Sequence, residues 1–119
     1  MGYTHLTAGD PSIESFRGVF NKIRRALGTT AFGINEIRLP PGAEGREHDE
    51  TDTGHEEVYV ILDGAGVFRV DGEDVPVSSG DYLRVDVGAT RLAVAGDEGM
   101  NFLAIGGKPL PEYDGRETL

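Results

Sequence analysis

The chain of 119 residues contains no cysteine, so it has neither disulfides nor thiolate metal ligands, and no cysteine nucleophile. Long apolar runs are also lacking: the longest cover a few residues, whereas a membrane-spanning helix needs about 20. The first residues show no basic region followed by an apolar stretch, as a secretory signal would. We therefore expect a soluble cytoplasmic protein.

Positive charge is scarce as well. The chain has 11 basic residues against 21 acidic ones, which gives a formal net charge of −10. An acidic surface of this kind repels the phosphates of nucleic acids and the head groups of anionic lipids. We therefore expect neither a nucleic acid nor a membrane surface as a partner.

Glycine, by contrast, is abundant, with 18 residues. Glycines at this density are typical of tight turns between short strands. The length suits one compact domain with a single core, and no repeat or linker divides the chain. We expect one domain over residues 1–119, with a polar tail over 108–119 that runs along the surface or frays.

From residue 57 onward, β-branched and aromatic segments alternate with turn signals. Gly64-Ala65-Gly66 is predicted to be a hairpin turn rather than a phosphate loop, because no helix follows it. Turns at such short intervals indicate a sandwich or barrel of antiparallel strands. No strand is followed by a helical stretch of crossover length, which argues against parallel βαβ units. The sequence thus predicts an all-β domain, with strands over 57–62, 67–70, 73–77, 82–85, 90–95 and 100–105.

The N-terminal third permits two interpretations. Residues 12–27 place apolar side chains at helical spacing behind Ser12, a possible N-cap, yet part of the same segment also fits a strand. The segment 31–39 follows like the second arm of a hairpin. Periodicity does not decide between helix and strand; we favour a short helical turn over 12–18 and a strand from about residue 19.

Candidate metal ligands gather between residues 44 and 57, in the segment EGREHDETDTGHEE. His48 and Glu50 are two residues apart and point to one face of an extended chain, and His55 and Glu57 repeat that relation. Imidazole with carboxylate suits zinc, manganese, iron, nickel or cobalt. In an acidic protein such a segment is also commonly a solvated loop, and spacing alone leaves both interpretations open.

Around these residues the chain resembles the cupin superfamily, from about residue 19 to 107. In the first cupin motif a His-x-His pair precedes a glutamate, and six residues separate that glutamate from a glycine. Glu57 and Gly64 keep this spacing, His48 matches the first histidine, and Glu50 stands where the second would be. The resemblance implies a jelly-roll β-barrel with a barrel core over 19–107.

The second cupin motif is less complete. Its glycines match Gly80 and Gly88, but its histidine position holds Arg91 and its asparagine position holds Ala95. Metal-binding cupins usually use three histidines and a glutamate, and a guanidinium cannot replace a histidine because it cannot coordinate a cation. The resemblance therefore implies an incomplete set of ligands. Its members are His48 and Glu57, with Glu50 as a substitute and His55 as a compensating ligand if its loop folds inward.

Arg91 has two possible roles inside such a barrel. It can form a salt bridge with Glu57 or Glu50, because a buried charge without a partner is costly. It can also anchor a carboxylate or phosphate ligand, and the two roles can alternate. Tyr59 shares the parity of Glu57 and is expected to be a pocket wall, although a strand tyrosine is more often core with its hydroxyl at the surface.

Three functions follow. The first is a metal-dependent enzyme, such as an oxygenase, isomerase or lyase. The second is a binding module that anchors a small ligand through Arg91, and the third is a structural unit; the fold does not choose among them, and whether a metal is bound stays open. Small jelly rolls often cover strand edges by pairing, so we expect a homodimer to which the segment before Thr30 contributes.

Overall fold

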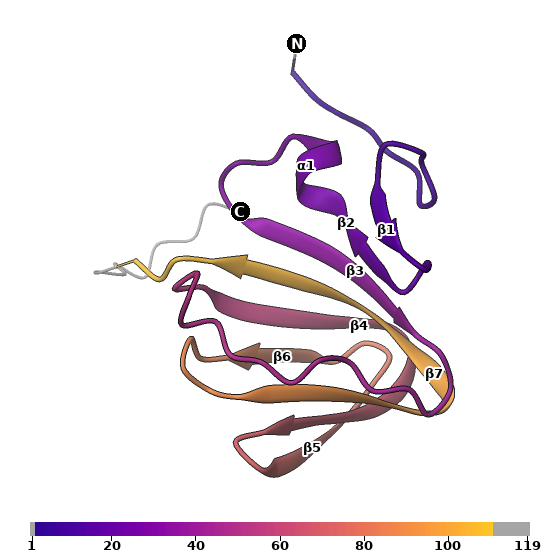
Figure 1. Ribbon diagram of the computed structural model, residues 1–119, viewed down its shortest axis with the longest axis vertical. Helices are drawn as coiled ribbons and strands as arrows, with labels where there is room; N and C mark the ends of the chain where they lie inside the picture. The colour runs from indigo at the N-terminus through magenta and orange to yellow at the C-terminus, as the bar shows by residue number, and fades with distance from the viewer. Residues whose placement is uncertain (1, 111–119) are drawn as a thin grey trace.

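The computed structural model describes residues 2–110, which form mainly antiparallel strands (Figure 1). The one helix among these residues is α1 (Ile23–Leu27), and none in the described range has the length and hydropathy to cross a membrane. The all-β prediction is confirmed. The strands are β1 (Glu14–Phe16), β2 (Phe20–Lys22), β3 (Gly33–Leu39), β4 (Glu56–Val70), β5 (Glu73–Ser78), β6 (Tyr82–Val85) and β7 (Arg91–Gly107).

Two long bent strands, β4 and β7, organise the barrel. The first half of β4 pairs with the second half of β7, and after register shifts on either side of Gly64 its second half pairs with the first half of β7. Gly64 has a φ of 78°, and a side chain there would collide with the carbonyl of Gly99. The absence of a side chain at Gly64 therefore allows β4 and β7 to approach each other closely. The predicted hairpin turn at 64–66 is wrong, and the strands predicted at 57–62 and 67–70 are halves of β4.

The sheet order is β1-β2-β3-β7-β4-β5, with β6 paired to the first half of β4. In Figure 1 the N-terminal elements β1, β2 and α1 lie at one end of the molecule and β5 at the other. Residues 40–55 contain no strand, but isolated bridges join Glu44 to Val94 and His48 to Arg91. The segment with the candidate ligands is thereby attached to β7.

An aromatic trio lies at the centre of the core. The ring of Tyr59 packs against Phe68 at 4.6 Å between centroids and edge-on against Phe102 at 5.7 Å. Phe68 and Phe102 contact each other at 5.2 Å. Aliphatic residues from β3, β4, β5, β6 and β7 complete this core, so the interior next to the candidate site is tightly packed.

The N-terminal segment combines both predicted conformations, in a different order. A helical turn over 12–18 is wrong: β1 and β2 form a hairpin there, because Arg17 and Gly18 both adopt positive φ angles, of 56° and 72°. The strand expected from about residue 19 is confirmed as β2, and the helical pattern is realised only in α1. The prediction for the tail falls largely on residues 111–119, which lie outside the described residues.

Candidate metal and ligand site

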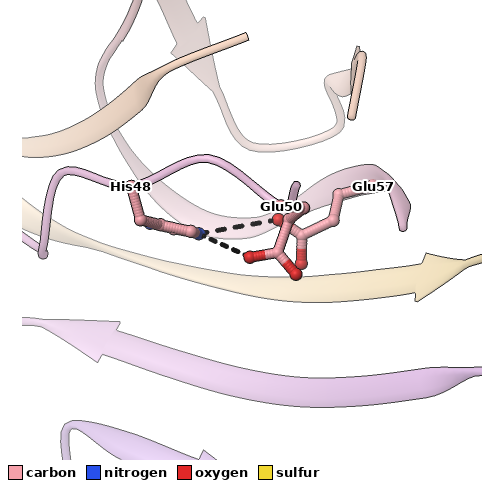
Figure 2. Close-up of side chains that lie close together, drawn as sticks. All are labelled: His48, Glu50 and Glu57. Atoms are coloured by element: carbon pink, nitrogen blue, oxygen red, sulfur yellow. Dashed lines mark ion pairs between the residues drawn. The ribbon is translucent and has the colours of Figure 1, made fainter. Parts of the chain in front are cut away.

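Three of the four predicted metal ligands converge. His48, Glu50 and Glu57 each offer one ligand atom, and these atoms lie within 4.8 Å of one another. Nε2 of His48 is 3.4 Å from Oε2 of Glu50 and 3.8 Å from Oε1 of Glu57 (Figure 2). His48 and Glu50 come from the segment between β3 and β4, whereas Glu57 lies at the start of β4. The group thus joins a loop and a strand, and three of the candidates that the sequence put forward lie together.

The orientation of His48 is fixed on two sides. Its backbone N–H donates to Arg91 O at 3.0 Å, and its ring nitrogen Nδ1 lies 2.9 Å from the carbonyl oxygen of Arg46. A carbonyl only accepts, so in the neutral ring the proton is on Nδ1 and the lone pair of Nε2 faces the two carboxylates. The Glu57 carboxylate, more than any other group, raises the pKa of His48 above its usual value, although burial opposes the shift.

A hydroxyl group that the sequence analysis missed holds Glu50 in place. Thr53 Oγ1 lies 2.9 Å from Oε1 of Glu50, and the same Oγ1 accepts the backbone N–H of His55 at 3.1 Å. The backbone N–H of Glu50 donates to Val87 O at 3.0 Å, which ties the loop to the segment before β7. A threonine three residues after a candidate ligand, inside a predicted loop, was the only signal for this contact.

Glu57 is a buried carboxylate with 9% of its surface exposed. The hydroxyl of Tyr59 donates a hydrogen bond of 2.5 Å to its Oε1. Burial alone would raise the pKa of Glu57, but the interactions with His48, Tyr59 and Arg91 outweigh it and hold the pKa below its usual value. Glu57 is therefore a charged ligand at neutral pH. The alternative in which the Tyr59 hydroxyl reaches the surface is wrong, because that hydroxyl points to Glu57.

Arg91 is one of the most deeply buried side chains, with 1% of its surface exposed. Its NH2 group donates to the backbone oxygen of Asp86 at 3.1 Å, while Nε lies 3.9 Å from Oε1 of Glu57. Nε and NH1 have no hydrogen-bond partner in the described chain. Buried donors normally have partners, so these two mark a place where a water molecule or a ligand group would be stabilised.

His55 lies outside the group of three. Its ring is beside Gly106, which pairs with Glu57 across the sheet. Nδ1 of His55 is 3.1 Å, and Cγ of Glu57 3.4 Å, from the position that a Cβ atom on Gly106 would occupy. The missing side chain at residue 106 thus leaves space for both groups on the same face.

The donor set fits a divalent transition-metal ion, because it combines one neutral imidazole nitrogen with two carboxylates. The two carboxylates carry a charge of −2 and the nearby guanidinium of Arg91 carries +1, so the net charge of these groups is −1. A divalent cation is therefore still attracted. Three protein ligands leave coordination positions for water or a ligand, as in catalytic rather than structural metal sites.

Two surface grooves lie elsewhere, lined by residues of β3 and of the N-terminal extension, which comprises residues 2–32. One, of about 440 Å³, is lined in part by Asp10, Asn21 and Arg38, and the other, of about 330 Å³, by Phe20 and a group of basic residues. Neither groove includes a residue of the His48–Glu50–Glu57 group. The candidate chemistry and the open grooves are therefore separate features of the molecule.

Comparisons with known proteins agree with the all-β fold. The family model of the cupin domain matches residues 35–106. A protein of Thermotoga maritima named oxalate-binding protein is 37% identical over 83 residues, 69% of this chain and 67% of that protein. Among solved structures, a cupin protein from Bacteroides fragilis has a TM-score of 0.76 and 27% identity, and the match covers 100% of this chain and 99% of the B. fragilis chain. A predicted oxalate decarboxylase from Thermotoga maritima has a TM-score of 0.72 and 25% identity, and the match covers 89% of this chain and 100% of the T. maritima chain.

Proposed function

This chain belongs to the cupin family, and from that premise we propose that its barrel binds a small molecule at a divalent metal ion held by His48, Glu50 and Glu57. The all-β cupin fold predicted from the motifs is confirmed. The observation that carries the proposal is the convergence of three donor atoms within 4.8 Å, with two of the donors on a loop that is attached to β7.

Each residue has a distinct part in this proposal. The ion, when bound, supplies positive charge that polarises a ligand oxygen. His48 presents Nε2 because Arg46 holds its Nδ1, and Glu57 brings a charge that stays ionised despite burial. Glu50 adds a second carboxylate where the family motif has a histidine. Zinc, manganese, iron, nickel and cobalt all accept this donor set.

We propose a small carboxylate as the ligand. The names of a sequence match and of a structural match, both from Thermotoga maritima, refer to oxalate, and the sequence match is 37% identical over 83 residues. A carboxylate oxygen is a suitable donor for a divalent metal, and the positive charge of Arg91 lies beside Glu57. An oxygenase, isomerase or lyase reaction at the ion is the catalytic form of the same proposal.

A binding module without a metal is the second candidate, because Arg91 offers two buried donors, Nε and NH1, that lack partners. Charge-assisted hydrogen bonds from a guanidinium to a carboxylate are among the stronger polar contacts in proteins. In this alternative Arg91 anchors the ligand, and Tyr59 forms part of the wall around it. The ligand class is the same, but binding would not need the ion.

Metal analysis and calorimetry distinguish the two candidates. We expect the purified, untagged protein to take up one divalent ion per chain, and His48→Ala to lose it, while Glu47→Gln, an exposed neighbour, retains it. Oxalate should bind the metal-loaded protein and not the protein treated with chelator. Oxalate binding to metal-free protein that Arg91→Gln abolishes would support the second candidate, and absence of metal uptake would overturn the first.

We also propose a homodimer formed through the N-terminal extension, residues 2–32. No residue of β1, β2 or α1 is buried, and β1 is an outermost strand with Phe16 67% exposed. The extension has four basic and two acidic residues, whereas residues 33–110 have six basic and 16 acidic ones. Such opposite charges allow each extension to pack against the barrel of the other copy. Cytoplasmic location, the single domain and the lack of nucleic-acid or membrane partners stay predictions.

A further inference from the structure

Polar contacts to the Glu57 carboxylate gather at one of its oxygens. Tyr59 donates its hydroxyl hydrogen to Oε1 at 2.5 Å, and His48 and Arg91 lie 3.8 Å and 3.9 Å from the same Oε1. The Glu57 carboxylate is therefore held in place through Oε1.

We infer that Tyr59 is a positioning residue of the proposed metal site: its hydroxyl holds Oε1 of Glu57 and so sets how that carboxylate faces Nε2 of His48. This inference rests on the metal-binding function proposed above. It assigns to Tyr59 a role distinct from that of a pocket wall, since the group that acts is the hydroxyl rather than the ring.

The surroundings of Tyr59 suit this role. Its ring packs against both Phe68 and Phe102, with centroids 4.6 Å and 5.7 Å away, so the position of the hydroxyl is set by packing. The hydroxyl is the donor in this contact, because a carboxylate oxygen only accepts.

The other two ligands are held in the same way. On Glu50, Thr53 Oγ1 contacts Oε1 at 2.9 Å, and Oε2 faces His48. On His48, the Arg46 carbonyl engages Nδ1 at 2.9 Å, and Nε2 faces the two carboxylates. Each of the three residues is thus held at one polar atom by a group outside the cluster: Thr53, the Arg46 carbonyl or Tyr59. Outer partners of this kind typically change metal affinity by about 10–100-fold.

A purely structural hydrogen bond is the alternative. In that case Tyr59 would only compensate the burial of Glu57, and its removal would lower stability without altering a bound ion. Tyr59→Phe separates the two roles because it retains the ring that packs against Phe68 and Phe102 and removes only the hydroxyl. Tyr82→Phe is the matched control, since Tyr82 is 78% exposed and pairs with Val60 at the far end of β6 from Val85, the partner of Glu57.

Cobalt binding tests the inference. We expect Tyr59→Phe to bind Co²⁺ about 10–100-fold more weakly than wild type and to change the visible absorption of the bound ion. Circular dichroism should show the same fold, and Tyr82→Phe should match wild type in both readouts. If wild type binds Co²⁺ and Tyr59→Phe binds it with equal affinity and an equal spectrum, the inference is wrong. If wild type binds no divalent ion, the proposed function itself fails.

A second measurement applies even if Tyr59→Phe does not fold. The chain has four tyrosines and no tryptophan, so replacement of Tyr3, Tyr82 and Tyr113 by phenylalanine leaves Tyr59 as the sole chromophore of its kind. Zn²⁺, which is spectroscopically silent, should then produce a tyrosine difference spectrum that saturates at the same stoichiometry as binding. Zn²⁺ binding without any change in the Tyr59 absorption would contradict the inference.

Discussion

His48 and Arg91 pair through two backbone hydrogen bonds: the N–H of His48 donates to Arg91 O at 3.0 Å, and the N–H of Arg91 to His48 O at 2.8 Å. The residue that matches the first histidine of one cupin motif is therefore adjacent to the residue that replaces the histidine of the other. Because of this pairing, the side chain of residue 91 lies next to Glu57. The substitution of histidine by arginine at this position places a fixed positive charge beside the ligands.

Arg91→His should therefore strengthen metal binding. The variant adds an imidazole where the family motif has one, and it removes a cation whose repulsion of a nearby ion amounts to several kcal/mol in a partly screened environment. We expect at least about tenfold tighter Co²⁺ binding, equivalent to about 1.4 kcal/mol. Competition with a chromophoric chelator measures the affinity.

Arg69→His on the second half of β4, outside the site, is the control and should bind Co²⁺ as wild type does. An Arg91→His protein that folds normally but gains no affinity would show that residue 91 does not face the ion. That result would favour the alternative in which Arg91 holds only Glu57.

The ion pair between His48 and the two glutamates predicts how the stability of the metal-free protein depends on pH. The pKa of His48 is raised in the folded state, first of all by Glu57. A raised histidine pKa stabilises the fold fully below the unfolded value of about 6.5, and this contribution is lost as pH rises through the folded pKa. Wild type should therefore exceed His48→Gln in stability by more at about pH 5.5 than at about pH 8.5.

Urea unfolding in the presence of a chelator measures this difference. His5→Gln in the exposed N-terminal segment is the control, and its stability relative to wild type should not change between the two pH values. A difference between wild type and His48→Gln that is constant, or larger at the higher pH, would mean that protonated His48 gains nothing from the carboxylates.

Much of the fold could be predicted from the sequence, because strand alternation depends on neighbouring residues. The apolar segments at 57–62, 73–77 and 82–85 all lie in strands. The bend at 64–66 could not be predicted, since a hairpin and a close crossing of two strands both require glycine. The distinction depends on Gly99, which lies 35 residues further along the chain.

The grouping of the candidate ligands was predictable to a similar depth. Alternation and the first cupin motif indicated His48, Glu50 and Glu57 as candidates, and these three converge in the structure. The groups that orient them were not predictable, because the Thr53 hydroxyl acts through a turn and the Tyr59 hydroxyl acts through the rotation of a packed ring. Whether His55 joins the group depends on how its loop folds, and no periodicity describes that.

Gly64→Ala tests the explanation of the bend. The added Cβ meets the carbonyl of Gly99 in a backbone conformation with positive φ, so both strain and collision oppose it. Gly72→Ala is the matched control: its φ is 83°, but nothing lies within 4 Å of the added atom. We expect Gly72→Ala to cost about 1–2 kcal/mol in the free energy of unfolding, and Gly64→Ala to cost at least about 3 kcal/mol or prevent folding. Equal costs would show that β4 and β7 do not approach closely here.

The proposed dimer makes a prediction about charge. Arg24 and Arg25 lie in the last turn of α1 and line the basic groove of about 330 Å³, next to Phe20. If the extension packs against the acidic barrel of a second copy, the double substitution Arg24→Glu and Arg25→Glu places like charges in contact and weakens the dimer. We expect wild type to sediment as a dimer and the variant to sediment as a monomer. High salt should also favour dissociation of the wild-type dimer, because it screens surface charges.

Arg69→Glu changes charge on β4 instead and should leave the dimer intact. A wild-type monomer at all concentrations would contradict the dimer itself, whereas a dimer that the double substitution leaves unchanged would show that another surface forms it.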